Sequence, residues 1–143
     1  MSREDGNVKS FRLICMEVKT DTKEKFHVIR VETLNFTAIM AAELNRQLLE
    51  LLKDNTKNVV VNLQGIANME EEAAETLVRL QQKFYEEGAS FVICNLQKNV
   101  ESFLDEKDLL EIMNVTPTES EAYDIVQMEE IERELLNGDD FDQ

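Results

Sequence analysis

One segment, from residue 58 to residue 88, limits the possible folds of this chain more than any other. It opens with VVVNL at residues 59–63, a short β-branched and apolar run that is typical of a strand buried on both faces. Gln64 and Gly65 are expected to end this strand, and a helical pattern begins at Met69. The segment therefore predicts a strand, a short turn and a helix. In open α/β sheets such a turn lies at the carboxyl end of a strand, where binding surfaces are usually built.

The expected helix carries one wide apolar stripe at helical spacing. Two adjacent rows form this stripe: Ala73, Leu77, Leu80 and Phe84, and Ala74, Val78, Gln81 and Tyr85. Asn68 is predicted to cap the N-terminus of the helix, with Glu71 three residues later as in a capping box. Gly88 is predicted to end the helix in a left-handed conformation.

Three glutamates, Glu70, Glu71 and Glu72, fall together in the first turn of this helix. The free amides and the dipole there favour negative charge, and each such interaction contributes about 0.3–1 kcal/mol when exposed. Stabilisation of the helix start therefore accounts for the triplet without a ligand. Consecutive helical residues point in different directions, so the triplet is a poor cage for a divalent cation, and no metal site is predicted.

The composition suits one globular domain with an acidic surface. The chain has 143 residues, of which 43% are hydrophobic and 31% charged, with a formal net charge of −15. This charge argues against nucleic acid and against an anionic membrane as partners. The first ten residues lack the apolar core of a secretory signal, and a cytoplasmic location is expected. The predicted domain organisation is an N-terminal tail at 1–10, one domain at 11–136 and an acidic tail at 137–143.

The remaining segments alternate strands with helices. Strands are expected at residues 11–18, 26–32, 59–63 and 90–96, with a short edge strand at Val115. Helices are expected after Asn35 or Thr37, from Met69, from Asn99, and from Thr118 to about Leu136. The short link between the first two strands favours an antiparallel pair, and the alternation that follows favours parallel pairing. The predicted fold class is α/β, with a mixed sheet (first strand pair antiparallel, remainder mostly parallel) covered by about four helices.

No pattern of catalytic residues is present. The chain lacks the glycine-rich phosphate loops and the G-x-S-x-G nucleophile motif, so no cofactor site is predicted. His27 is the single histidine and is expected on the surface of its strand. Cys15 and Cys94 lie in apolar runs and are expected to be buried free thiols. The chain is therefore not expected to be an enzyme.

With this order of elements, the chain resembles the STAS domain, the fold of bacterial anti-sigma factor antagonists. The signature of that family is an apolar strand, Asp-Leu-Ser-Gly, a hydrophobic pair, and Asp-Ser-Ser-Gly opening a helix. The stretch VVVNLQGIANMEEEAAETL has the same frame, with Asn62 in place of the strand-end Asp. Glu70 falls on the second Asp, and Glu71 and Glu72 fall on the two serines. NFTAIMAAEL at 35–44 and PTESEA at 117–122 resemble the starts of the family's first and last helices.

The resemblance implies regulation by partner switching. In the family, the unmodified antagonist binds an anti-sigma factor, usually a serine kinase, and phosphorylation of the first of the two serines ejects it. In this chain that position is Glu71, a degenerate phosphoacceptor position without a hydroxyl, so the switch cannot operate there. Two interpretations stay open: Glu71 is a fixed mimic of the phosphorylated state, or it is retained only because glutamate stabilises the helix start.

The resemblance places a partner-binding surface at this turn and helix start, beside the turn after Leu34. The predicted binding residues are Asn68, Met69, Glu70, Glu71, Glu72 and Glu75. The implied partner is an anti-sigma factor or a related kinase-like protein. The alternative is a scaffolding STAS module that forms a homodimer through its long last helix, whose apolar positions are Ala122, Ile125, Met128, Ile131 and Leu135. A third possibility is a sensor of a small ligand.

Overall fold

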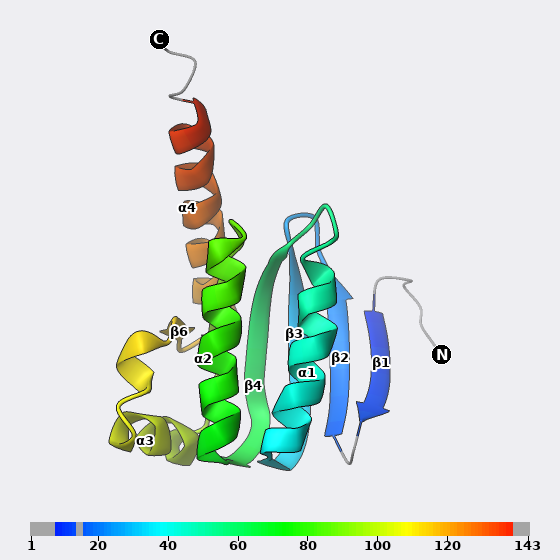
Figure 1. Ribbon diagram of the computed structural model, residues 1–143, viewed down its shortest axis with the longest axis vertical. Helices are drawn as coiled ribbons and strands as arrows, with labels where there is room; N and C mark the ends of the chain where they lie inside the picture. Colours follow the sequence, from blue (N-terminus) through cyan, green and yellow to red (C-terminus); the bar gives the residue numbers. More distant parts are fainter. Residues whose placement is uncertain (1–7, 14–15, 139–143) are drawn as a thin grey trace.

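A computed structural model describes residues 8–13 and 16–138, and the side chains of residues 16–136 (Figure 1). The elements in chain order are β1 Val8–Leu13, β2 Met16–Thr22, β3 Phe26–Phe36, α1 Ala38–Leu51, β4 Asn58–Met69, α2 Glu71–Glu86, β5 Phe91–Cys94, α3 Lys98–Glu106, the 3₁₀ helix η1 Leu110–Ile112, β6 Val115–Thr116 and α4 Glu119–Gly138.

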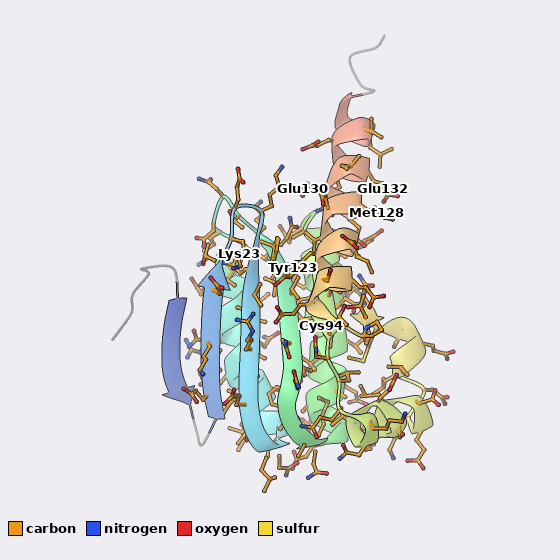
Figure 2. All side chains as sticks on the ribbon, turned by 180° about the vertical axis from the view of Figure 1, so that it is seen from behind. Lys23, Cys94, Tyr123, Met128, Glu130 and Glu132 are labelled. Carbon is orange, nitrogen blue, oxygen red and sulfur yellow. The ribbon has the colours of Figure 1, made fainter. Side chains whose placement is uncertain are left out.

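The described strands form one mixed sheet in the order β1-β2-β3-β4-β5-β6. The pairs β1–β2 and β2–β3 are antiparallel, and every later pair is parallel. Helices α1 and α2 cover one face of the sheet, and α4 lies on the opposite face (Figures 1 and 2). The predicted α/β class, with a mixed sheet and four α-helices in the described chain, is thus confirmed.

The first expected strand, at residues 11–18, is in fact two strands. Phe11 in β1 lies opposite Val18 in β2, so the two residues expected at the ends of one strand face each other across a hairpin. The apolar run through this segment contains no turn residue that would have revealed the reversal. Cys15 lies outside the described residues. Strand β1 begins inside the expected tail at 1–10, and α4 continues to Gly138; the domain boundaries themselves stay a prediction.

Strand β4 does not end at Gln64 and Gly65, as expected, but continues to Met69. A β-bulge interrupts its pairing with β3: Arg30 lies opposite Asn62, whereas Glu32 lies opposite Gly65. The bulge brings the backbones close together, because a Cβ at position 65 would lie 2.6 Å from Glu32 Cγ and 2.8 Å from the Val31 carbonyl oxygen. Glycine here marks a close approach between strands rather than the end of a strand.

The central strand is buried on both faces, as its sequence predicts. Val59 and Val61 belong to the main core, which lies between the sheet and the helices α1 and α2. Val60 belongs to a smaller core under α4, with Val92, Cys94, Ala122 and Val126. The apolar positions of α4 do not all share this core: beyond Val126 the helix exposes Met128, Ile131 and Leu135.

Helix α2 ends as predicted at Gly88, which has a φ of +76°. The amide of Gly88 donates to the Tyr85 carbonyl at 3.0 Å, and the amide of Ala89 donates to the Phe84 carbonyl at 2.9 Å. These two bonds form a Schellman motif, in which a left-handed residue satisfies the last carbonyls of a helix. The chain then turns directly into β5.

The expectation that His27 lies on the strand surface is wrong, because its side chain is buried. The segment that connects α1 to β4 passes over the start of β3, and the Thr56 carbonyl lies 3.0 Å from His27 Nε2. On the other side of the ring, Nδ1 lies 2.9 Å from the Thr22 hydroxyl. His27 therefore has a structural position between β2 and this segment.

Candidate partner-binding surface

The predicted surface lies where the two central parallel strands end and two helices begin. Asn35 pairs with Asn68, and Phe36 pairs with Met69, at the carboxyl ends of β3 and β4. Helices α1 and α2 start immediately after these pairs, so their N-termini lie side by side at one end of the molecule (Figure 1). The long pairing beyond the bulge is therefore what brings the two helix starts together.

Glu70 connects the two helix starts. Its backbone amide donates to the Phe36 carbonyl at 3.0 Å, and its carboxylate accepts from the Ala38 amide at 2.9 Å. The side chain thus satisfies a free amide of α1, although Glu70 itself is the N-cap residue of α2 and makes no side-chain cap there. The Thr37 hydroxyl accepts from the Met40 amide at 3.3 Å. Of the two predicted candidates, Asn35 and Thr37, it is therefore Thr37 that is the N-cap residue of α1.

The expected capping box of Asn68 and Glu71 is wrong. Asn68 belongs to β4 and receives a hydrogen bond from Asn99 Nδ2 at 3.3 Å, while the same nitrogen donates to the Ala67 carbonyl. Glu71 is the first residue of α2 rather than its third. The capping box does not form because β4 continues beyond its apolar run and Asn68 pairs with Asn35 of β3.

Five of the six predicted binding residues are exposed: Asn68, Glu70, Glu71, Glu72 and Glu75. Glu71 lies 3.6 Å from Lys107 Nζ, an exposed ion pair of the kind that contributes little to stability. Glu72 and Glu75 have no cation within ion-pair distance among the described residues. Met69 is buried, so it supports this surface from beneath rather than facing a partner.

Two exposed apolar residues complete the surface: Leu34 is 77% exposed and Ile39 is 65% exposed. Leu34 precedes the last pairs of β3, and Ile39 follows Ala38, whose amide binds Glu70. Sequence patterns had pointed only to the turn after Leu34. The helical spacing of the buried residues Met40, Ala41, Leu44 and Leu48 leaves Ile39 off the buried stripe, which was the available signal. We call Leu34, Ile39, Glu70, Glu71, Glu72 and Glu75 together the helix-start surface.

A polar cluster on the other face of the sheet fixes the start of α4. Glu119 accepts two bonds from Arg30, Nε and Nη2 each at 3.0 Å, one from Asn62 at 2.7 Å and one from the Tyr123 hydroxyl at 2.8 Å. Asn62 Oδ1 accepts from the Gln64 amide at 2.9 Å, so the same cluster satisfies the backbone at the bulge.

The bonds in this cluster control how its members titrate. Burial acts to raise the pKa of Glu119, but hydrogen bonds from Arg30, Asn62 and Tyr123 outweigh it and hold the pKa below the usual range. Burial, together with the hydrogen bond to Glu119, raises the pKa of Tyr123 to about 12. Burial and the nearby Glu119 carboxylate raise the pKa of the Cys94 thiol to about 12. Cys94 and Tyr123 (both labelled in Figure 2) are therefore protonated at neutral pH.

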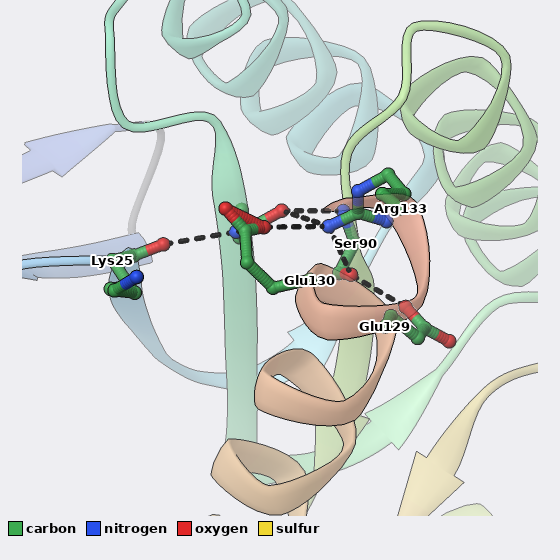
Figure 3. A network of polar contacts seen from close by, with 6 residues as sticks. Lys25, Ser90, Glu129, Glu130 and Arg133 are labelled. Carbon is green, nitrogen blue, oxygen red and sulfur yellow. Dashed lines mark hydrogen bonds and ion pairs between the residues drawn. The ribbon is translucent and has the colours of Figure 1, made fainter. Parts of the chain in front are cut away.

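A second polar cluster holds the middle of α4 (Figure 3). Arg133 Nη2 donates to Asn58 Oδ1 at 3.1 Å, to Ser90 Oγ at 3.2 Å and to Glu130 at 3.0 Å. The Ser90 hydroxyl donates to Glu129 at 2.5 Å. Burial acts to raise the pKa of Glu130, but hydrogen bonds from Asn58 and Arg133 outweigh burial, so the pKa is lowered. Because these bonds join α4 to Asn58, the first residue of β4, and to Ser90, which directly precedes β5, the helix is fastened to the sheet at two points.

The described residues hold no group of three His, Cys, Asp or Glu side chains that could bind a metal ion. Among the helices in the described part of the chain, none is both long and apolar enough to cross a membrane.

The STAS domain family model matches residues 17–122 of the 143. The chain belongs to the STAS domain family. A comparison with curated protein sequences found no match. The matched range contains β4, the turn and the start of α2.

Similar solved structures come from several kinds of protein. An anti-sigma factor antagonist from Mycobacterium paratuberculosis has a TM-score of 0.67 at 14% identity, over 78% of this chain and 94% of that chain. A serine-to-glutamate variant of RsbS from Moorella thermoacetica has a TM-score of 0.65 at 18% identity, over 77% and 94%. The murine anion transporter Slc26a9 has a TM-score of 0.61 at 13% identity, over 76% of this chain but 19% of that chain. At these identities the similarity shows the STAS fold alone.

Proposed function

We propose that this STAS protein is a non-enzymatic, cytoplasmic regulator that resembles an anti-sigma factor antagonist and binds a protein partner through the helix-start surface. The observation that carries the proposal is the position of Leu34 and Ile39, two exposed apolar side chains beside a row of exposed glutamates. Apolar anchors with a polar rim are typical of protein interfaces. The anti-sigma factor antagonist among the similar structures supports an anti-sigma factor or a related kinase-like protein as the partner.

A protein fits this surface better than a small ligand does. Small-molecule sites are usually concave, with volumes of about 300–1,000 Å³. Three cavities of about 540, 440 and 370 Å³ lie elsewhere on the molecule and include no residue of the helix-start surface. The cavity next to the bulge, of about 220 Å³, includes none of them either. The net charge of −15 disfavours nucleic acid, which requires positive charge for phosphate contacts.

We expect Ile39→Asp to weaken partner binding at least about tenfold, because it places a charge in the apolar centre of the contact. The partner is first isolated on immobilised wild-type protein from a native lysate and identified, and its affinity for each variant is then measured by titration calorimetry. Tyr85→Asp is the matched control, since Tyr85 is also an exposed large side chain but lies at the C-terminal end of α2. Equal affinity of Ile39→Asp and wild type would exclude the helix-start surface as the binding site.

The second prediction concerns the degenerate phosphoacceptor position. The double change Glu71→Ser and Glu72→Ser is expected to leave partner affinity unchanged while lowering stability by about 0.3–1 kcal/mol for each charge lost at the helix start. Partner affinity is expected to stay unchanged because exposed charges at the rim of an interface affect affinity little. Tighter binding by the double variant would instead identify Glu71 as a phosphoserine mimic, and weaker binding would make the glutamates direct contacts. Calorimetry and thermal unfolding of the same samples separate these three outcomes.

A further inference from the structure

The second half of α4 carries an apolar stripe that no described element covers. Met128, Ile131 and Leu135 are 60%, 50% and 64% exposed. Their spacing of three and then four residues places them on one side of the helix, as in the a and d positions of a coiled coil. The opposite side carries Val126 and Arg133, which face the sheet. In Figure 2, Met128 and Glu132 lie on the other flank of α4 from Glu130.

The position of the helix makes this stripe accessible. The last turns of α4 project beyond the end of the sheet and beyond the end of α2 (Figure 1). The helix-start surface lies at the opposite end of the molecule in the same view. The stripe is therefore separate from the surface proposed above, and the two sites can be tested independently.

The charges beside the stripe have one sign. Asp124 precedes the stripe on the same side of the helix, and Glu132 and Glu134 lie on its two flanks, at the e and g positions. These three carboxylates form no ion pair within the described residues. Arg133 cannot neutralise them, because its guanidinium is bonded to Asn58, Ser90 and Glu130 on the sheet side of the helix.

This arrangement disfavours a second copy of the chain as the occupant. Packing two α4 helices along their stripes would set Glu132 and Glu134 of one copy against the same acidic side chains of the other, in molecules that each carry a net charge of −15. Like charges at e and g positions oppose pairing, whereas opposite charges select the partner helix.

We propose that α4 is a docking helix for a basic amphipathic helix of another protein, with apolar residues at three-four spacing and Lys or Arg on both flanks. The apolar side chains of that helix pack against Met128, Ile131 and Leu135, and its cations pair with Glu132 and Glu134. Together with the helix-start surface, this gives the STAS domain two binding sites at opposite ends.

The test uses the full chain and a synthetic helical peptide of about three heptads, with Leu at the core positions and Lys on the flanks. A second peptide has Glu in place of every Lys. Titration calorimetry is expected to show binding of the Lys peptide alone, with an affinity at least about tenfold weaker for Ile131→Asp and for Leu135→Asp. The affinity is also expected to fall as salt increases from about 0.1 M to about 1 M, because the screening length shrinks from about 10 Å to about 3 Å.

Ile39→Asp is the control and should bind the Lys peptide as wild type does, because it alters the other end of the molecule. Thermal unfolding of the Ile131 and Leu135 variants should match wild type, since both side chains are exposed. No binding of the Lys peptide, equal binding of the Glu peptide, or unchanged binding by both α4 variants would overturn the proposal. Sedimentation showing a wild-type dimer that Ile131→Asp dissociates would also overturn it, because a second copy would then be the occupant.

Discussion

Replacing Glu119 by alanine is expected to lower the free energy of unfolding by about 2 kcal/mol, the largest effect of any single charged residue on α4. Breaking a buried ion pair costs about 3–5 kcal/mol, and the figure is reduced here because the Arg30 side chain is 40% exposed and is screened by water. The substitution also removes the hydrogen bonds that the same carboxylate accepts from Asn62 and Tyr123. The Asn62 amide is buried, so it would lose its partner without gaining free access to water.

Urea denaturation at neutral pH measures this difference. Asp124→Ala is the matched control, because Asp124 is an exposed carboxylate on the same helix and should change stability by less than about 0.5 kcal/mol. A loss for Glu119→Ala no greater than for the control would show that the cluster does not hold α4 on the sheet.

The same carboxylate gives a pH dependence. The pKa of Glu119 is lowered in the folded protein, so its contribution is fully present above the unfolded pKa of about 4.3 and is lost as the pH falls through the folded value. Glu119→Gln cannot ionise, and its stability should therefore fall less steeply in acid than that of wild type. Equal slopes in the two proteins below about pH 4.5 would contradict this linkage.

Replacing Gly65 by valine is expected to lower the free energy of unfolding by about 2–3 kcal/mol, at the upper end of the usual cost of overpacking. The first added carbon would lie 2.8 Å from the Val31 carbonyl oxygen and 3.0 Å from Glu32 Cα. Both are backbone atoms of the paired strand and cannot move aside as a side chain can. The paired segments of β3 and β4 would have to separate at the bulge, next to the segment that positions both helix starts.

Gly88→Asn is the control for the addition of a side chain at a glycine. Gly88 has a left-handed φ of +76°, which asparagine tolerates, and a Cβ there meets nothing within 4 Å. Thermal unfolding should show a large decrease for Gly65→Val and a small one for Gly88→Asn. Similar decreases would mean that backbone conformation, rather than the close approach of β3, explains the glycine at position 65.

The sequence alone determined the features that depend on local pattern. A run of valines specified a strand buried on both faces, and helical spacing specified the buried row Ala73, Leu77, Leu80 and Phe84 of α2. The second predicted row was wrong at Tyr85, which is 73% exposed. Gly88 marked a left-handed helix end, and Pro117 stands directly after the short edge strand at Val115. These features follow from side-chain periodicity and backbone preference, which act within one or two turns of chain. They were sufficient to recognise the STAS frame.

The tertiary structure decided what depends on residues distant in sequence. Pairing with β3 extended β4 through Gln64 and Gly65, and this took Asn68 out of its expected cap. Glu70 was predicted to stabilise its own helix, but its carboxylate reaches the amide of Ala38, 32 residues earlier. Arg30 and Glu119 are 89 residues apart, and no pattern in the sequence around either residue predicts that the two side chains meet. A pattern in one segment reports which side of that segment is buried; only the packed chain determines which polar groups meet, because each contact depends on the register and position of both partners.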